Sequence, residues 1–388
     1  MDLEKVANTI HTKKEIEGQP ALWISTINSL KKNKNIQKFL SPLVEKKELN
    51  IILTGAGSSS YIGESVQHLF RFKKGIHARA VSTTTLVTHF KNHIDPETPL
   101  LLISFARSGN SPESNAVVDI TENFCSEVHH IAITCNENGK LAKKVNEMPN
   151  GLAIILPPES EDQGLAMTGS FTSMILAAIY VANYKNFSEQ SSLIEHMASS
   201  AEKIIEECSP GLKELSYDDF DRIVFLGSGP LLAISKESHL KVQELTDGYV
   251  VGKFDSFLGF RHGPKAVVNN NTVLVFLFST DQNVFRYEKD LVEQIIKDGI
   301  AKYCVGVFCD KEQAEYLNLD QKIVFELGEE QKKSAYHLLL DVLPAQIIGY
   351  YKSLDLGLNP DSPSQNNAIS RVVKGVTIYP LNNEDPLL

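Results

Sequence analysis

Two loops in the first half of the chain carry small hydroxyl and glycine residues that suit phosphate binding. One is Thr54–Ser60 and the other is Ser104–Ser114, and each leads into a stretch with helical patterning. Backbone N–H groups at a helix N-terminus favour anions, and serine hydroxyls add donors without bulk. The same residue types are common in ordinary turns and helix caps, so either loop alone is ambiguous. Because the loops follow neighbouring predicted strands, we favour a shared phosphate site.

The second half of the chain holds two residues whose side chains suit proton transfer and one lysine that is most simply a surface residue. Glu244 lies on a predicted helix, Ser235–Leu245, His262 lies in a loop that contains glycine and proline, and Lys374 follows an apolar run. A helix-end carboxylate, a loop histidine and a surface lysine are each common without any function. Polar residues on loops nevertheless carry function more often than most, and carboxylate and imidazole groups catalyse proton transfer near pH 7.

The elements that must position these residues are short apolar runs that alternate with amphipathic stretches. Near-continuous apolar runs are typical of strands covered on both faces of a parallel sheet, and intervening helices imply right-handed connections. In the first half, such runs lie at residues 51–53, 100–103, 131–133 and 152–156. Ligands of open parallel sheets bind beyond the carboxyl ends of the strands, where both serine-rich loops lie.

The same pattern recurs in the second half of the chain. Ile223–Leu226 precedes Gly227-Ser228-Gly229 as Ile51–Thr54 precedes Gly55-Ala56-Gly57, and later runs at 273–276, 304–308 and 323–325 keep nearly the same offset. The sequence therefore predicts an α/β protein with two tandem, doubly wound (flavodoxin-like) parallel sheets and helical N-terminal and bridging segments. The expected divisions are a helical segment at residues 1–45, a first domain with bridging helices at 46–215, and a second domain with a C-terminal tail at 216–388.

Composition excludes several classes of protein. The 388 residues carry a formal net charge of -10, which argues against nucleic acid or an anionic membrane as partner. No apolar run is long enough to span a membrane and the charged N-terminus lacks an apolar signal region, so we expect a cytoplasmic protein. None of the 5 cysteines belongs to a Cys-x-x-Cys pair, so we expect neither a disulfide framework nor a metal site. Nucleotide-binding loops of the Walker or GxGxxG type are missing, and we expect no cofactor.

Four motifs resemble the sugar isomerase (SIS) domain family in its double-domain form. They are Gly55–Ser59, Ser104–Ser111, Lys241–Leu245 and Arg261–Pro264. Within the family, Ser104–Ser114 and Gly259–Lys265 look most like the tagatose-6-phosphate ketose/aldose isomerase group, whose members are also described as galactosamine-6-phosphate deaminase/isomerases. The resemblance covers about residues 45–380 and extends to the isomerase half of glucosamine-6-phosphate synthase.

The resemblance implies which residues bind and convert a sugar phosphate. The phosphate-binding residues that it implies are Ser59, Arg107 (through its backbone), Ser108 and Ser111, and the substrate-lining residues are Gly57, Ser58, Leu165 and Ala166. The implied catalytic residues are Glu244 as base, His262 as the ring-opening group, and Lys374 as a charge-stabilising group. In the family the histidine comes from a neighbouring subunit, which implies a homodimer or a larger homo-oligomer.

The resemblance also implies the reaction. A hexosamine 6-phosphate would open its ring and move its C2 proton to C1, so that galactosamine 6-phosphate gives tagatose 6-phosphate and ammonia. Only a short segment that begins Met1-Asp2 precedes the first predicted strand, where the synthase carries a glutaminase domain, so we expect amine release rather than amine addition. Three alternatives stay open at this point: an aldose–ketose isomerase of hexose 6-phosphates, a fructosamine-6-phosphate deglycase, and a non-catalytic sugar-phosphate sensor.

Overall fold

The computed structural model describes residues 10–71, 76–185, 190–366, 368–373 and 375–379. They fall into two compact units, each built around one sheet. The first, which we call the N-sheet unit, lies within Ser25–Glu161, Ser170–Gln190 and Ser370–Leu388. The second, the C-sheet unit, lies within Met1–Ile24, Asp162–Gly169 and Ser191–Ile369. Each unit is therefore assembled from segments that are far apart in the sequence.

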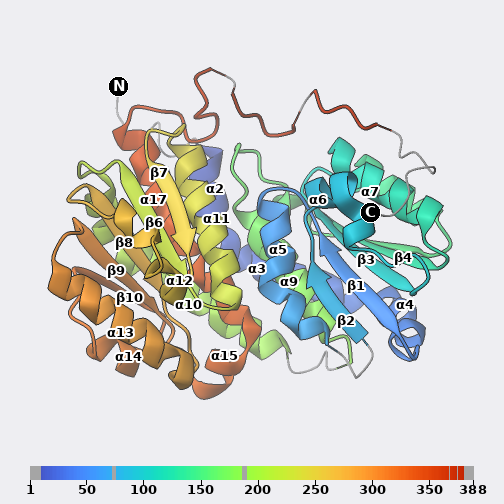
Figure 1. Ribbon diagram of the computed structural model, residues 1–388, viewed down its shortest axis with the longest axis horizontal. Coiled ribbons are helices and arrows are strands. Elements are labelled where there is room, and N and C mark those ends of the chain that lie inside the picture. The colour runs from blue at the N-terminus through green and yellow to red at the C-terminus, as the bar shows by residue number, and fades with distance from the viewer. Residues whose placement is uncertain (1–9, 72–75, 186–189, 367, 374, 380–388) are drawn as a thin grey trace. The chain divides into compact units, whose positions relative to one another are not determined.

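Each unit contains a 5-stranded parallel sheet (Figure 1). The strand order is β2-β1-β3-β4-β5 in one unit and β10-β9-β8-β6-β7 in the other, which is the same order in chain-relative terms. The strands are β1 Leu49–Thr54, β2 Ile76–Ala80, β3 Leu100–Ala106, β4 Val128–Thr134, β5 Gly151–Ile155, β6 Arg222–Gly227, β7 Val251–Asp255, β8 Thr272–Leu277, β9 Tyr303–Phe308 and β10 Gln321–Val324. The prediction of two tandem, doubly wound sheets is confirmed.

The edge strands β2 and β7 were not among the predicted runs. Both alternate exposed with more buried residues, as the sequences Ile-His-Ala-Arg-Ala and Val-Gly-Lys-Phe-Asp show. A strand at the edge of a sheet has fewer neighbours to bury it, so its sequence can lack the continuous apolar run that marks a central strand, although the opposite edge strands β5 and β10 keep part of such a run.

Helices connect the strands and precede the first sheet. The α-helices are α2 His11–Glu17, α3 Gln19–Lys32, α4 Asn35–Val44, α5 Ser58–Val66, α6 Thr83–His89, α7 Pro112–Phe124, α8 Lys140–Glu147, α9 Gly169–Ala182, α10 Gln190–Ser216, α11 Pro230–Leu245, α12 Phe257–Phe260, α13 Gln282–Asp298, α14 Lys311–Glu315, α15 Glu329–Lys333, α16 Leu338–Asp341 and α17 Leu343–Asp355. None of the helices in the described part of the chain has the length and apolar character needed to cross a membrane.

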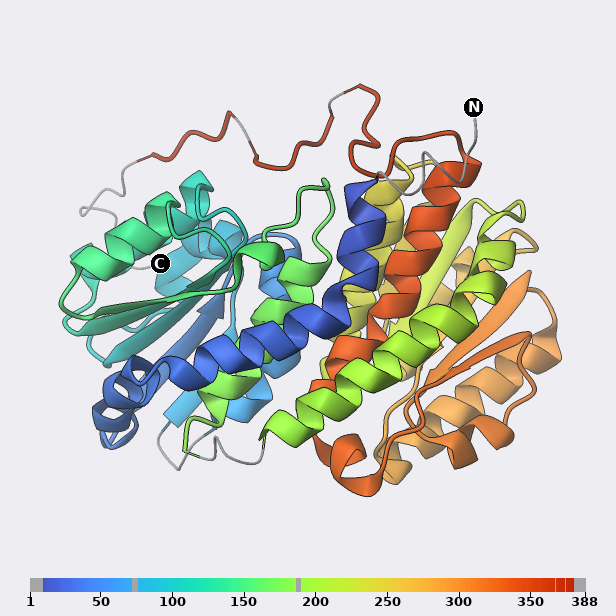
Figure 2. The same ribbon diagram turned by 180° about the vertical axis from the view of Figure 1, so that it is seen from behind.

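Each sheet is covered by helices on both faces (Figures 1 and 2). On one face of the N-sheet, Ile52, Leu100 and Leu102 pack in one core cluster with side chains of α6, α7 and α8, such as Leu86 and Val117. On the corresponding face of the C-sheet, the cluster joins strand residues to α12, α13 and α14 and is rich in phenylalanine. Figure 2 shows α10 and α17 over the other face of the C-sheet. Burial on both faces explains the apolar runs of the central strands.

One tight turn is repeated in both units, where the first central strand enters its helix. A Cβ added to Gly55 would lie 2.5 Å from the backbone of Ser59, and one added to Gly227 would lie 2.4 Å from the Leu231 carbonyl oxygen, so neither position has room for a side chain. The glycine that precedes each helix adopts nearly the same conformation, with φ 55 and ψ -130 at Gly57 and φ 55 and ψ -124 at Gly229. This positive φ favours glycine.

Candidate functional site

The two serine-rich loops lie next to each other at the carboxyl edge of the N-sheet. One follows β1 and the other follows β3, and these strands are neighbours that align Thr54 with Ser104. Helix α5 begins at Ser58 and α7 begins at Pro112, so each loop ends at a helix N-terminus. The structure thus brings Gly57, Ser58 and Ser59 to the same edge of the sheet as Arg107, Ser108 and Ser111.

Two backbone N–H groups in the first turn of α5 already donate hydrogen bonds to nearby carbonyl oxygens. The Ser59 N–H donates to the Ala56 carbonyl (3.1 Å) and the Ser60 N–H donates to the Gly57 carbonyl (2.9 Å). All three serine residues of this turn are buried, at 5%, 6% and 6% exposure. The N–H groups of Ser59 and Ser60 are therefore already used within this turn.

The second loop is held in place through its carbonyl oxygens. The Arg107 carbonyl accepts from Thr134 Oγ1 (3.2 Å), the Gly109 carbonyl accepts from the Leu141 N–H (2.9 Å), and the Ser111 carbonyl accepts from Asn115 Nδ2 (2.9 Å). These bonds fix the loop and turn its acceptor groups toward the protein. The loop is therefore better equipped to bind an anion than a cation.

The serine hydroxyls of the second loop have local partners. Ser111 Oγ donates to Glu113 Oε2 (2.6 Å), and the Asn110 N–H donates to Ser108 Oγ (3.3 Å). A bound phosphate must therefore displace the Glu113 carboxylate from the Ser111 hydroxyl. Arg107 is buried, and its Nη2 donates to the Arg371 carbonyl (2.9 Å), which fastens part of the C-terminal segment beside the loop.

In the C-sheet unit, Glu244 belongs to a cluster of charges along α11. Lys241 Nζ donates to Glu244 Oε2 (2.6 Å) and lies 3.2 Å from Glu237 Oε1. Lys241 and Glu237 are fully buried, whereas the Glu244 side chain is 23% exposed. Burial lowers the pKa of Lys241, but the two carboxylates outweigh it and raise this pKa above its usual value. Lys241 is therefore held in its charged form and orients the Glu244 carboxylate. Of the three side chains, only that of Glu244 is accessible to solvent.

Glu237 and Lys241 were not predicted as site residues. They stand at i and i+4, and Glu244 follows Lys241 at i+3, which is the spacing of ion pairs along one helix face. This spacing was visible in the sequence, but it is equally typical of exposed helix pairs. What distinguishes the cluster is burial: removal of the lysine would leave the Glu237 carboxylate without its ammonium, at a cost of about 3–5 kcal/mol.

His262 lies in an exposed turn directly after α12. The segment around it is fastened to α13 on both sides, because Arg261 Nη2 contacts Asp290 Oδ2 (2.8 Å) and Lys265 Nζ contacts Asp298 Oδ2 (2.6 Å). The backbone of the turn is thus fixed while the imidazole stays exposed, as expected for a loop histidine.

Leu165 and Ala166 lie in the Asp162–Thr168 loop. Hydrogen bonds join this loop to α2 and to Asp361, which are far apart in the sequence of the C-sheet unit. Glu15 of α2 accepts from the Gln163 N–H (2.5 Å), and the Leu165 N–H donates to the Asp361 carbonyl (3.0 Å). Ala166 is 1% exposed and Leu165 is half-buried, so Leu165 is the more accessible of the two.

Burial and the neighbouring carboxylate of Asp162 raise the pKa of Glu15 to about 7.

Lys374 lies outside the described residues. The described residues on either side of it, 371–373 and 375–379, form no strand.

The C-sheet edge that corresponds to the serine-rich loops is occupied by a carboxylate. Glu288 of α13 is fully buried, and its Oε2 accepts from the Ser279 N–H (2.9 Å) in the loop after β8. It also interacts with Ser228 in the loop after β6. The two units therefore share a turn but differ in the groups beside it: one edge carries hydroxyl donors and the other holds a buried carboxyl group.

Comparisons with known proteins extend along the whole chain. Residues 43–183 match the model of the SIS domain. A D-galactosamine-6-phosphate deaminase AgaS from Shewanella sp. (strain ANA-3) is 37% identical over 95% of this chain and 92% of its own length. The chain belongs to the AgaS family of SIS-domain proteins.

Two further comparisons, one of sequence and one of structure, agree. AgaS from Escherichia coli O157:H7, a D-galactosamine-6-phosphate deaminase, is 36% identical over 95% of each chain. The crystal structure of tagatose-6-phosphate ketose/aldose isomerase from Escherichia coli superposes with a TM-score of 0.86 at 33% identity, covering 96% of this chain and 97% of that one. The expected family is thus confirmed by sequence and by structure.

Glu288 gives the AgaS-family chain a pH dependence of stability. Burial raises the pKa of Glu288 from 4.5 to about 7. The folded chain therefore binds this proton more tightly than the unfolded chain, and the resulting stability, about 3 kcal/mol, is present below pH 4.5 and lost as the pH rises through about 7. Thermal melts between about pH 5 and pH 8 should show a smaller loss of Tm with rising pH for Glu288→Gln than for the wild type.

Glu293→Gln is the matched control, because Glu293 is exposed on the same helix. Its melting profile should follow that of the wild type. Parallel profiles for the wild type and Glu288→Gln would show that Glu288 does not titrate in this range.

Proposed function

We propose that this chain is a deaminase/isomerase that converts galactosamine 6-phosphate and water to tagatose 6-phosphate and ammonia. The observation that carries the proposal is the similarity to D-galactosamine-6-phosphate deaminase AgaS over 95% of this chain. The fold and the charged groups described above are compatible with this chemistry, which needs an anion site, a carboxylate base and a proton donor.

We assign substrate binding to the serine-rich edge of the N-sheet. The 6-phosphate would be held by the hydroxyls of Ser59, Ser108 and Ser111 and by the backbone of Arg107, with Gly57, Ser58, Leu165 and Ala166 lining the sugar. The burial of Ser59 and the internal use of the loop carbonyls support this assignment. Charge-assisted hydrogen bonds to phosphate oxygens are stronger than neutral ones, so even a few donors suffice.

We assign the proton transfers to Glu244, His262 and Lys374. The His262 imidazole would move the proton between the anomeric hydroxyl and the ring oxygen, which opens the ring. The Glu244 carboxylate would take the proton from C2, giving an enolamine, and return it to C1, giving the C2 imine of the ketose. Lys374 would stabilise charge at the oxygen or amine end.

Water completes the reaction without a metal or an organic cofactor. It adds to the C2 imine, the C–N bond breaks, and ammonia leaves as the C2 carbonyl of tagatose 6-phosphate forms. Lys241 is well placed to support the base, since its ion pair with Glu244 fixes the carboxylate on α11.

A second candidate is a plain aldose–ketose isomerase of hexose 6-phosphates. The structural relative that is named tagatose-6-phosphate ketose/aldose isomerase, at a TM-score of 0.86, favours it. The same C2-to-C1 transfer on a substrate without an amine stops at the ketose. The two candidates thus share one site and differ in whether an imine is hydrolysed.

We further propose a homodimer or larger homo-oligomer in the cytoplasm, with His262 acting in the site of a neighbouring subunit. The exposed position of His262 on a fixed turn supports this arrangement.

Incubation of the full chain with galactosamine 6-phosphate should release ammonia together with tagatose 6-phosphate. Glucosamine 6-phosphate serves as the parallel substrate, and we expect it to react much more slowly. Ammonia would be measured with a coupled assay and the ketose by NMR. Absence of ammonia from both sugars, with ketose formed from galactose 6-phosphate, would replace the deaminase with the isomerase.

Glu244→Gln should abolish turnover and keep sugar-phosphate binding. General acid–base catalysis contributes about 10²–10⁴-fold, so kcat should fall by at least about 100-fold. Glu206→Gln, an exposed carboxylate on α10 of the same unit, is the control and should keep full activity. Near-normal turnover by Glu244→Gln would remove Glu244 as the base.

The double variant Ser108→Ala/Ser111→Ala should bind 6-phosphorylated sugars at least about 100-fold more weakly, because each hydrogen bond to a charged group contributes about 1.5–3 kcal/mol. Ser228→Ala changes the corresponding loop of the C-sheet and should leave the affinity unchanged. Calorimetric titration provides the measurement. Equal affinity of the double variant and the wild type would place the phosphate elsewhere.

A further inference from the structure

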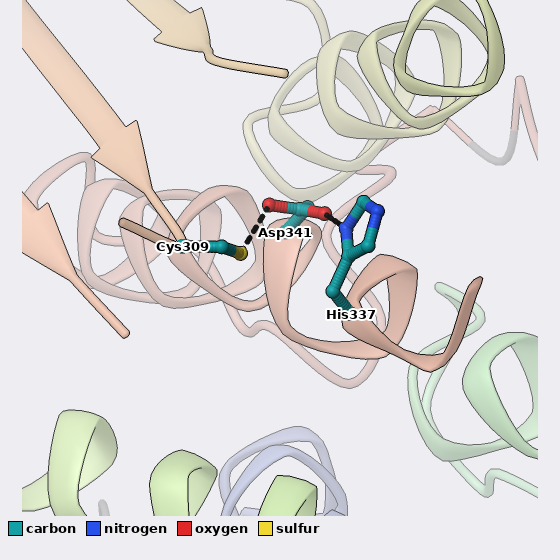
Figure 3. A group of neighbouring side chains, drawn as sticks. All are labelled: Cys309, His337 and Asp341. Carbon is teal, nitrogen blue, oxygen red and sulfur yellow. Dashed lines mark hydrogen bonds and ion pairs between the residues drawn. The ribbon is translucent and has the colours of Figure 1, made fainter. Parts of the chain in front are cut away.

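Three potential metal ligands from two segments meet at the carboxyl edge of the C-sheet. They are Cys309, the residue directly after β9, His337, which precedes α16, and Asp341, which ends it. Their ligand atoms all lie within 4.8 Å of one another. Figure 3 shows Asp341 between the other two: its Oδ2 contacts His337 Nδ1 (2.7 Å), and its Oδ1 contacts Cys309 Sγ (3.7 Å).

The residue types and their spacing fit Zn²⁺ or a similar borderline-soft divalent ion. Thiolate, imidazole and carboxylate are its usual protein ligands, at about 2.3 Å from sulfur and about 2.0–2.2 Å from nitrogen or oxygen. Tetrahedral bonds of these lengths place ligand atoms about 3.3–3.6 Å apart. The separation of 3.7 Å between Sγ and Oδ1 is close to this value, and the hydrogen bond between Nδ1 and Oδ2 must open to admit the ion.

Burial and charge around the cluster also suit a cation. Cys309 and Asp341 are each 1% exposed, whereas the His337 side chain is 14% exposed and leaves a route to solvent. A thiolate and a carboxylate would together neutralise a divalent ion, which makes its burial tolerable. The nearby cation of Lys332 is compensated by Asp310, whose Oδ2 lies 2.8 Å from Lys332 Nζ.

Other chemistry suits the cluster less well. In a nucleophilic triad the histidine contacts the cysteine, but here the carboxylate stands between them. A redox role requires an accessible thiolate. Cys309 is instead buried, at 1% exposure.

We propose that Cys309, His337 and Asp341 form a Zn²⁺ site with three protein ligands and one position open to water. On binding, the ion replaces the thiol proton of Cys309, which passes to solvent, and sulfur becomes a thiolate ligand. The ion would tie the end of β9 to α16, a short helix in contact with α11, which carries Glu244. The site is separate from the groups that bind and convert the sugar, so its test does not depend on the proposed activity.

Cobalt substitution of the reduced, chelator-treated full chain tests the site directly. One equivalent of Co²⁺ should produce a thiolate-to-cobalt charge-transfer band in the near ultraviolet and visible bands of tetrahedral intensity. Zn²⁺ should then remove both. Loss of an outer-shell partner lowers metal affinity by about 10–100-fold, so Cys309→Ser, which removes a ligand, should lower Zn²⁺ affinity by at least about 100-fold and abolish the charge-transfer band.

His337→Gln should weaken Zn²⁺ binding to a similar degree and keep the charge-transfer band at saturating Co²⁺. Cys304→Ser is the matched control, because Cys304 lies near the other end of the same strand and should leave the spectrum and affinity unchanged. Melting curves without metal show that each variant is folded. No charge-transfer band in the wild type, or a band that persists in Cys309→Ser, would overturn the proposal.

Discussion

The turn from the first central strand into its helix is the constraint on which each unit depends. In both copies the chain turns from the strand into the helix within a few residues. The backbone of the first helical turn lies so close to a glycine that no Cβ fits there. The following glycine needs a positive φ. The turn thereby decides where Ser58 and Ser59 lie in one unit and where α11 begins in the other.

From this shared turn the two units have diverged in electrostatics rather than in shape. The N-sheet edge carries hydroxyl donors on two loops whose carbonyl oxygens are engaged elsewhere. The C-sheet edge holds the buried carboxylate of Glu288, and its helix α11 holds a lysine between two glutamates. A repeated fold thus supplies donors for an anion in one copy and acid–base groups in the other, and neither copy duplicates the other's chemistry.

The sequence allowed the central strands, the repeat and the two serine-rich loops to be predicted, because each leaves a local pattern. The edge strands β2 and β7 escaped, since partial exposure replaces the apolar run with alternation. Glu244 was predicted, but its partners Lys241 and Glu237 were not, because helix spacing does not reveal burial. Cys309, His337 and Asp341 lie too far apart in the sequence to form a motif, and only the fold of the C-sheet unit brings them together.

The segmented C-sheet unit has a consequence for the order in which the chain folds during synthesis. Asp361, near the end of this unit, accepts hydrogen bonds from the N–H groups of His11 and Thr12. Helix α2 is made before both sheets, yet some of its partners, Asp361 among them, are made only near the end of the chain. The N-sheet, whose strands lie between Leu49 and Ile155, can form in the meantime. Helix α2 thus completes its packing only after α17 has been made, and Ile16, which is 3% exposed in the finished protein, reaches its full burial late in synthesis.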